Sequence, residues 1–417
     1  MAGRPGGGLR AQSPLRVPGD KSISHRALLL AAQAGGVSRI AGLSDGDDVY
    51  RTLEAIRALG ARVSDDPTGA LRVEGGALHR PLAPIFAGNS GTTMRLLAGF
   101  CAPLPWRTVI VGDESLSRRP MDRVVGPLRA MGARIEGGDG GRLPPLEILG
   151  GALRGIDYEM PMASAQVKAA ILLAGLHAEG ETVVRERIRT RAHTEELLAR
   201  CGADVTVEDD GHTVRLKPSP LRPFALEVPG DPSQAAFWVV AACLVPNSEL
   251  DVGPVYVGPA RTGFIEVLRR MGAHVEVDGG HIRARVSSLR ATTIAGDEVP
   301  GLIDELPVLA VAGALAEGTT EIRNASELRV KESDRIAAMA DGLRRLGADV
   351  ETRGDGLVVR GPTRLVGATV DAHGDHRVAM ALAVAGLAAE GETTVEGWDA
   401  VSISYPTFEE DLHLCLS

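Results

Sequence analysis

The chain has 417 residues, a formal net charge of −9 at pH 7 and only 3% aromatic residues. This length allows two or more domains, each with a sizeable core. The acidic balance and the shortage of aromatic rings are atypical of proteins that bind nucleic-acid phosphates and stacked bases, so we expect no nucleic-acid partner.

The chain starts with a glycine-rich segment, MAGRPGGGLRAQ, which has two arginines but no apolar core and does not fit a secretory signal peptide. No later apolar stretch reaches the roughly 20 residues that a membrane helix needs. The cysteines Cys101, Cys201, Cys243 and Cys415 are scattered without a CxxC pair, which is typical of reduced thiols rather than of a disulfide framework or a zinc site. We therefore predict a cytoplasmic protein with no membrane partner.

Six segments of apolar and small residues recur along the chain, and each is about ten residues long. They begin at Arg26, Arg95, Ala169, Ala236, Pro307 and Arg377. A helix that is apolar on all sides is typically buried. We therefore predict six helices that lie inside the protein.

A second series of helices alternates with the first and is amphipathic. Five of its members end in Gly-Ala followed by a strand-like alternation, as in ALGARV. Glycine at this place ends a helix because it adopts a left-handed conformation without steric cost. The glycines are Gly60, Gly132, Gly202, Gly272 and Gly347, at separations of 72, 70, 70 and 75 residues. A sixth would fall near the last residue, where PTFEEDLHLCLS stops in mid-pattern.

Each period of about 70 residues thus contains a buried helix, a strand, an exposed helix and further strands, and the chain contains six such units. The sequence VPGD at 17–20 returns at 228–231, an offset of 211 residues, which groups the units three and three. We predict an α/β (α+β) protein in which residues 18–228 form one domain. Residues 229–417 form the other, completed by a strand from residues 1–17, and crossings near 17–20 and 228–231 form a hinge.

A polar motif precedes each buried helix. In chain order the motifs are GDKSISH, GNSGTTM, SAQVK, PGDPSQ, IDEL and GDH. One motif alone is typical of helix capping, but four of them also carry Lys, Arg, His, Gln or a second carboxylate, which capping does not need. Helix amino ends attract phosphate and carboxylate groups, so the motifs together indicate a small, multiply anionic substrate. Gly88–Thr93 resembles an anion-cradling turn but lacks the Gly-Lys-Ser/Thr ending of a P-loop.

The residues alone leave several alternatives open. KESDR, residues 331–335, is typical of a solvated helix start with i,i+3 ion pairs. Arg118 and Arg119 suit the surface as well as a binding site, and His376 suits a capped position in the core. His373, three residues earlier, hints at a metal pair, but no third ligand is evident and we expect no metal.

Seven motifs, spread over nearly the whole chain, resemble those of the 5-enolpyruvylshikimate-3-phosphate synthase family, the 3-phosphoshikimate 1-carboxyvinyltransferases. They are GDKSISHR, GNSGTTMR, RRPM, SAQVK, IDE, LRVKESDR and GDHR. The resemblance implies the enolpyruvyl transferase fold, with two domains of three βαβαββ units each. It implies transfer of the enolpyruvyl group of phosphoenolpyruvate to the 5-hydroxyl of 3-phosphoshikimate, with release of phosphate, on the route to chorismate and aromatic amino acids.

The resemblance also implies which residues bind the substrates. Those for 3-phosphoshikimate are Lys21, Ser22, Arg26, Ser164, Ala165, Gln166, Arg191, Asp304 and Lys331. Those for phosphoenolpyruvate are Lys21, Asn89, Gly91, Arg119, Gln166, Lys331, Arg335 and Arg377. Asp304 and Glu332 are the implied acid and base, and Lys21 is placed to assist the leaving phosphate. The resemblance implies a monomer without cofactor or metal, and inhibition by glyphosate, for which Gly91 leaves room.

Three positions depart from the family pattern. Ala165 stands where many relatives have a second serine, Ala192 follows Arg191 where they usually have aspartate, and Ile403 stands where part of the family has a lysine that contacts phosphoenolpyruvate. The sister enzyme that transfers enolpyruvyl to UDP-N-acetylglucosamine is an alternative. Its Lys-Asn pair is missing here, since Ser22 follows Lys21, and its loop cysteine is missing from GDESLSRRPM. A non-catalytic repeat protein is a second alternative, for which acid and base groups would be superfluous.

Overall fold

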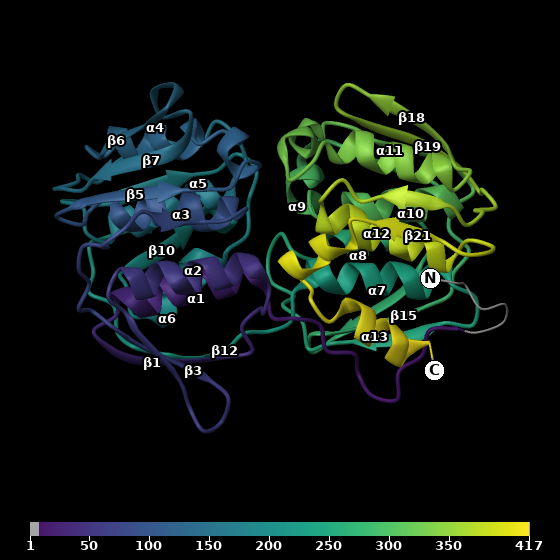
Figure 1. Ribbon diagram of the computed structural model, residues 1–417, viewed down its shortest axis with the longest axis horizontal. Helices are drawn as coiled ribbons and strands as arrows, with labels where there is room; N and C mark the ends of the chain where they lie inside the picture. The colour runs from purple at the N-terminus through teal and green to yellow at the C-terminus, as the bar shows by residue number, and fades with distance from the viewer. Residues whose placement is uncertain (1–7, 417) are drawn as a thin grey trace. The chain divides into compact units, whose positions relative to one another are not determined.

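The computed structural model describes residues 8–416 and divides the chain into two compact units (Figure 1). Unit 1 comprises Met1–Asp20 and Pro229–Ser417, and of these residues 8–20 and 229–416 are described. Unit 2 comprises Lys21–Val228. The chain therefore passes from one unit to the other between Asp20 and Lys21, at the end of the first VPGD sequence, and returns between Val228 and Pro229, at the start of the second.

Unit 2 contains three successive repeats of helices and strands. The first has α1 (Lys21–Gln33), β1 (Gly36–Ala41), α2 (Asp47–Ala58), β2 (Arg62–Asp65) and β3 (Leu71–Gly75). The second has β4 (Ile85–Phe86), α3 (Gly91–Cys101), β5 (Arg107–Val111), α4 (Asp122–Ala130), β6 (Arg134–Gly138) and β7 (Leu143–Leu149). The third has β8 (Asp157–Glu159), α5 (Ala165–Gly175), β9 (Thr182–Arg185), α6 (His193–Arg200), β10 (Val205–Glu208) and β11 (Thr213–Leu216), and β12 (Ala225–Glu227) follows it.

Unit 1 repeats the pattern. Its first repeat has α7 (Pro232–Leu244), β13 (Glu249–Val252), α8 (Gly263–Arg270), β14 (His274–Asp278) and β15 (His281–Arg285). The second has β16 (Thr293–Ile294), α9 (Val299–Leu302), α10 (Leu306–Leu315), β17 (Gly318–Ile322), α11 (Arg335–Arg345), β18 (Asp349–Arg353) and β19 (Gly356–Gly361). The third has β20 (Thr369–Asp371), α12 (His376–Leu387), β21 (Thr394–Glu396) and α13 (Phe408–Cys415).

The predicted enolpyruvyl transferase architecture is confirmed, with one sheet for each of the six repeats. Three sheets have the same order, β4-β5-β7-β6, β10-β11-β9-β8 and β16-β17-β19-β18, and the sheet β12-β1-β3-β2 repeats it with a first strand from the end of the unit. The β13-β15-β14 sheet gains parallel bridges from Arg10 and Leu15 instead. The sixth repeat differs from a full βαβαββ unit, because the described chain ends after α13 and its sheet has only β20 and β21.

The helices confirm both predicted series. The buried helices are α1, α3, α5, α7, α10 and α12. Each begins before its apolar run, five residues earlier for α1 and one for α12, because part of the preceding motif belongs to the helix. The five predicted glycines end the other series with φ between 77° and 108°. Gly99 has a different role: a Cβ there would lie 2.1 Å from the Ala170 carbonyl oxygen, so glycine lets α3 and α5 touch.

Candidate active site

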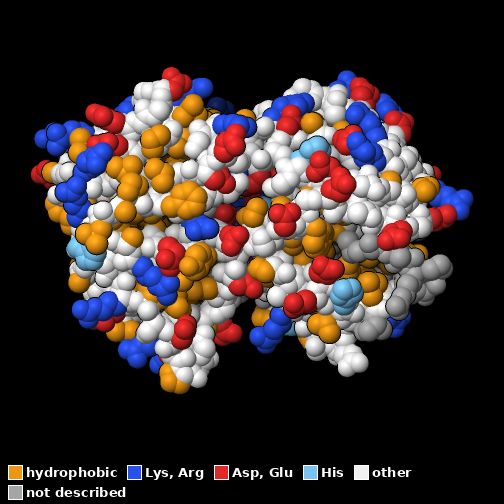
Figure 2. All heavy atoms as spheres, viewed as in Figure 1, with side chains coloured by type: hydrophobic (Ala, Val, Ile, Leu, Met, Phe, Trp, Pro, Cys, Tyr) orange, Lys and Arg blue, Asp and Glu red, His pale blue; other side chains and the backbone are white. Residues whose placement is uncertain are grey.

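Many charged side chains of the protein form ion pairs on its surface. Pairs such as Arg185–Asp157 and Arg345–Asp341 join half-exposed groups, and Figure 2 shows acidic and basic side chains mixed over the face in view. Such exposed pairs contribute little to the free energy of folding, and they do not mark a functional site. The buried charged groups are therefore the more informative ones, and they gather at the starts of the buried helices.

In unit 2, hydrogen bonds connect the starts of α1, α3 and α5. Gln166 Nε2 donates to Thr92 Oγ1 over 2.9 Å, and Arg95 Nη1 donates to Gln166 Oε1 over 2.7 Å. Arg26 Nη2 donates to the carbonyl oxygen of Ala165 over 3.1 Å. The first turns that carry the predicted motifs therefore lie together within this unit.

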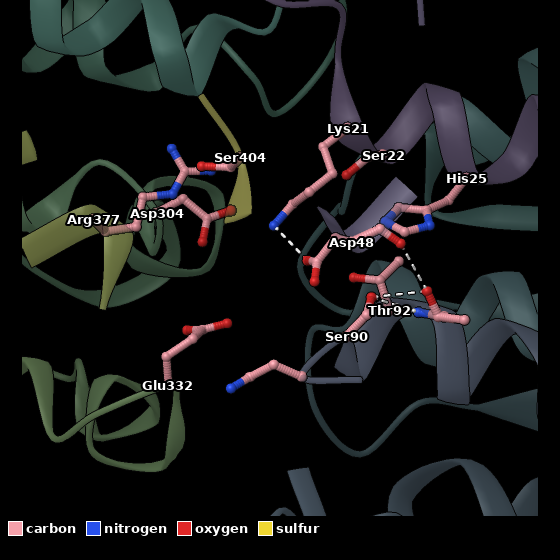
Figure 3. Close-up of polar contacts among 12 residues, drawn as sticks. Lys21, Ser22, His25, Asp48, Ser90, Thr92, Asp304, Glu332, Arg377 and Ser404 are labelled. Atoms are coloured by element: carbon pink, nitrogen blue, oxygen red, sulfur yellow. Dashed lines mark hydrogen bonds and ion pairs between the residues drawn. The ribbon is translucent and has the colours of Figure 1, made fainter. Parts of the chain in front are cut away.

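Lys21 has a partner that the sequence did not suggest. Its Nζ lies 3.0 Å from Asp48 Oδ2 at the start of α2, and the Lys21 side chain is only 16% exposed (Figure 3). The only signal for Asp48 in the sequence is the acidic run DGDD, residues 45–48, at the start of α2. The pair leaves an ammonium group held in place at the first turn of α1.

Asn89, Gly91 and Arg119 surround the start of α3. Arg119 is buried, and its Nη2 donates to Asn89 Oδ1 and, over 3.3 Å, to Ser115 Oγ. The neighbouring Arg118 is exposed instead, so of the two arginines only Arg119 joins this group. A Cβ on Gly91 would lie 3.0 Å from Arg95 Nη1 and 3.6 Å from Arg119 Nη1, so glycine keeps space between the two guanidinium groups and the helix start.

Ser22, Arg26 and Arg191 form a third group in unit 2. Arg191 Nη1 donates to Ser22 Oγ over 3.1 Å. Arg26 is buried, and it donates from Nη1 to the Ser22 carbonyl oxygen over 2.9 Å and from Nε to Thr194 Oγ1 over 2.7 Å. Arg26 thus ties α1 to the start of α6 as well as to α5, whereas Ser164 caps α5 by accepting from the Val167 N–H.

In unit 1, Arg335 lies among three carboxylates. Its Nε is 2.8 Å from Asp375 Oδ2, its Nη2 is 2.7 Å from Glu332 Oε2, and its Nη1 is 3.5 Å from Asp304 Oδ1. Although burial disfavours the charged guanidinium, these carboxylates, Asp375 foremost, raise the pKa of Arg335. The solvated start predicted for KESDR is therefore wrong: the i,i+3 pair with Glu332 forms, but Arg335 is 2% exposed because α11 packs it against Asp375.

Lys331 and Arg377 complete the cationic residues predicted in unit 1. Burial lowers the pKa of Lys331, while Glu327 and Asp304 oppose this shift. Arg377 is buried in the first turn of α12, where its guanidinium carbon lies 5.9 Å from the centre of the Phe237 ring. Among the residues that the structure describes, its Nε and Nη1 have no hydrogen-bond partner. Figure 3 shows Arg377 with Asp304, Glu332 and Ser404 of the same unit.

Several residues at these helix starts escaped the sequence analysis. The sequence predictions include Arg95 only as the first residue of an apolar segment, although an arginine at the start of such a segment is a signal for a buried charge. Arg261 gave no signal in its loop, yet its guanidinium is buried and contacts Asp20, Asp231 and Ser233 at 2.9, 2.5 and 2.9 Å. Arg261 therefore joins the unit 1 sides of both chain crossings.

His373 and His376 lie in different environments. His376 is buried at the start of α12, as a core position would require, whereas His373 is exposed beside Asp371. Within residues 8–416, no group of three or more His, Cys, Asp or Glu side chains could hold a metal ion. Within the same residues, no helix has the length and apolar character that crossing a lipid bilayer requires.

The chain matches one protein family over residues 6–412, described as EPSP synthase (3-phosphoshikimate 1-carboxyvinyltransferase). It is 51% identical to a 3-phosphoshikimate 1-carboxyvinyltransferase of Gloeobacter violaceus, covering 97% of this chain and 96% of that one. A second, from Geobacillus kaustophilus, is 49% identical, with 96% and 97% covered.

Solved structures agree with these matches. The EPSP synthase of Acinetobacter baumannii has a TM-score of 0.84 and 40% identity, covering 99% of this chain and 97% of that one. The enolpyruvyl transferase NikO of Streptomyces tendae, at 22% identity and a TM-score of 0.80, shares the fold over 98% of this chain and 96% of that one. The resemblance seen in the motifs is confirmed, and the chain belongs to the EPSP synthase (3-phosphoshikimate 1-carboxyvinyltransferase) family.

Proposed function

We propose that the chain transfers the enolpyruvyl group of phosphoenolpyruvate to the 5-hydroxyl of 3-phosphoshikimate. The hydroxyl oxygen adds to C2 of phosphoenolpyruvate while C3 gains a proton, giving a tetrahedral intermediate. The intermediate then loses phosphate and a proton from C3, which restores the double bond. The observation that carries this proposal is the buried Arg335, since its contacts with Asp304 and Glu332 place two carboxylates beside one fixed cation.

We assign the phosphate and ring hydroxyls of 3-phosphoshikimate to binding residues in unit 2. Ser22 and Arg191 are already hydrogen-bonded to each other, Ser164 caps α5, and Gln166 stands in the first turn of that helix. Free N–H groups and positive charge at a helix start suit a phosphate. Arg26, itself an assigned contact, holds Ser22 and Thr194 in place. The remaining assigned contacts are Lys21 and Ala165 of unit 2 and Asp304 and Lys331 of unit 1.

Phosphoenolpyruvate carries a phosphate and a carboxylate, and the assigned cations suit both. In unit 2 these are Lys21 and Arg119, with Asn89, Gly91 and Gln166 beside them. In unit 1 they are Lys331, Arg335 and Arg377. The unpaired donors Nε and Nη1 of Arg377 support this assignment, because a buried guanidinium without an acceptor is costly and an anionic ligand would supply one.

Asp304 and Glu332 are proposed to move the two protons. Arg335 holds both carboxyl groups in place, with its Nη1 3.5 Å from Asp304 Oδ1 and its Nη2 2.7 Å from Glu332 Oε2. Lys21 is proposed to stabilise or protonate the departing phosphate, since an ammonium group offers three donors to phosphate oxygens.

Ile403 alters one contact that part of the family makes. It is the last residue of the 3-10 helix Trp398–Ile403, and the next carbonyl oxygen, that of Ser404, accepts a hydrogen bond of 3.1 Å from Gln234 Nε2. An isoleucine side chain has no donor for phosphoenolpyruvate. The cations named above therefore carry this task alone in our proposal.

The decisive experiment measures phosphate release by the purified protein with phosphoenolpyruvate and 3-phosphoshikimate, and then with UDP-N-acetylglucosamine as the acceptor. We expect turnover with the first acceptor and none with the second. Turnover with the UDP-sugar alone would refute the proposal, and release with neither would favour a binding protein. We further propose that the protein acts as a monomer and that it works in the cytoplasm. The four buried free thiols support the second statement, because reduced thiols are typical of that compartment.

A further inference from the structure

Lys168, the last residue of the SAQVK motif, lies outside the set of proposed substrate contacts. Its side chain is fully buried on α5, where Nζ lies 2.7 Å from Glu186 Oε2 and 2.8 Å from Glu195 Oε1. Both carboxylates are also buried. We call Lys168, Glu186 and Glu195 the Lys168 clamp.

The clamp joins the two ends of the connection between β9 and α6. Glu186 directly follows β9, and Glu195 stands in the first turn of α6. One ammonium group therefore fastens both ends of residues 187–194 to α5. Replacing buried ion pairs by apolar residues is often neutral or stabilising, so stability alone does not explain this arrangement.

The clamp reaches the residue next to Arg191. The Thr190 hydroxyl donates to Glu186 Oε1, and the Arg26 Nε bond to Thr194 Oγ1 fixes the other side of the connection. Arg191 lies between these anchored residues, with its Nη1 3.1 Å from Ser22 Oγ. Its successor, Ala192, stands at the start of α6 and has no side-chain acceptor with which to orient the arginine.

We propose that Lys168 is a positioning residue for Arg191, acting through Glu186 and Glu195. By fixing the backbone on both sides of Arg191, the clamp holds its guanidinium beside Ser22, where the proposed function places the 3-phosphoshikimate phosphate. Lys168 thus affects the binding of one substrate without touching it. This inference rests on the proposed function, because it concerns the binding of that substrate.

The test is a double-mutant cycle between Lys168→Met and Arg191→Ala, read out as KM for each substrate. We expect Lys168→Met to raise KM for 3-phosphoshikimate about tenfold, which corresponds to about 1.4 kcal/mol, and to change kcat and KM for phosphoenolpyruvate less than about twofold. In the Arg191→Ala background the same change should have almost no effect on KM, because interacting residues are not additive.

Controls separate positioning from general stability. Lys168→Arg keeps the charge and should restore most of the affinity. Leu173→Ala, a buried change on the same helix, should lower the melting temperature without shifting KM for 3-phosphoshikimate. Lys168→Met leaves two buried carboxylates without their cation and could fail to fold for that reason. Glu186→Gln preserves the size of the side chain, so the same cycle is repeated with this variant. If Lys168→Met does not fold, the Glu186→Gln cycle tests the proposal.

The proposal is overturned if either variant raises KM equally in both backgrounds, or if it lowers the melting temperature and leaves KM unchanged. A wild-type protein that releases no phosphate with 3-phosphoshikimate would instead refute the proposed function. The two failures are therefore distinguishable in one set of assays.

Discussion

Lys21 Nζ and Asp48 Oδ2 lie 3.0 Å apart, and both side chains are largely buried at the starts of α1 and α2. The carboxylate holds the ammonium group in place, so little ordering is left for the moment when phosphate binds. A preorganised cation stabilises developing negative charge better than one that must first be ordered.

Lys21→Ala should therefore lower kcat by about 100-fold or more, because it removes the proposed partner of the leaving phosphate. The variant should still fold, since the lysine is not part of the apolar core. Phosphate release and thermal melting check both statements. Lys217→Ala, at an exposed lysine in the same unit, is the matched control. Near-normal turnover of Lys21→Ala would remove Lys21 from the mechanism.

Glu332→Gln should slow turnover by about 100-fold or more while KM for either substrate changes little. The amide keeps the size of the side chain and can still accept from Arg335 Nη2, but it cannot exchange a proton at neutral pH. Steady-state kinetics with both substrates provide the measurement. Glu351→Gln changes an exposed glutamate of the same unit and should have no effect. Equal loss in both variants would contradict the assignment.

Gly91→Ala should weaken inhibition by glyphosate, which we expect to compete with phosphoenolpyruvate. The added Cβ would lie 3.0 Å from Arg95 Nη1, so the guanidinium must shift by a few tenths of an ångström and the space beside it shrinks. One methyl group in a tight site changes selectivity by about 10- to 200-fold. Inhibition constants at several phosphoenolpyruvate concentrations check this. Gly126→Ala, where a Cβ meets nothing within 4 Å, should leave the constants unchanged.

His25 should make the protein less stable in mild acid. Burial, aided by Lys21 and Arg26, lowers the pKa of His25 well below 6.5 in the folded state, and its Nδ1 lies 2.7 Å from Thr52 Oγ1. Below pH 6.5, His25 therefore binds a proton in the unfolded chain but remains neutral in the folded chain. The stability contributed by neutral His25 is complete above pH 6.5 and falls as the pH drops below it, by at most about 1.4 kcal/mol per pH unit.

Denaturant unfolding at pH 7.5 and pH 5 measures this effect in the wild type and in His25→Gln, whose side chain does not titrate. The variant should lose less stability on acidification than the wild type. The exposed His373 offers the control, because His373→Gln should preserve the wild-type pH dependence. An unchanged pH dependence in His25→Gln would show that other groups dominate.

Addition of both ligands should reduce the radius of gyration of the protein. The proposed contacts of each substrate come from unit 1 and from unit 2, and the chain passes between the units at 20–21 and at 228–229. Binding energy can therefore be used to close a hinge. Small-angle scattering with 3-phosphoshikimate and glyphosate, compared with the ligand-free protein, checks this. Scattering curves that coincide would contradict a hinge.

Local features of the sequence were sufficient to predict the repeats. Gly60 and Gly347 end helices because a single residue with positive φ suffices, and Ser90 and Asp375 cap helices because a cap needs only its own first turn. These features depend on neighbours in the chain, so a single sequence reveals them.

Contacts between elements could not be predicted in the same way. The pairing of Lys21 with Asp48 depends on how α1 packs on α2, and the solvated start expected for KESDR failed because Asp375, 40 residues away, covers Arg335. The residue types at the helix starts were identified, whereas their partners and their burial required the packed structure.

The outer strands also constrain how the protein forms on the ribosome. The Leu9 N–H bonds to Ser248 Oγ, 239 residues further along, and Leu15 bridges to Val252. Unit 2 is one uninterrupted stretch and can assemble as soon as β12 has been translated. Residues 9–15 must wait for β13, so they acquire these partners only after the whole of unit 2 has been translated.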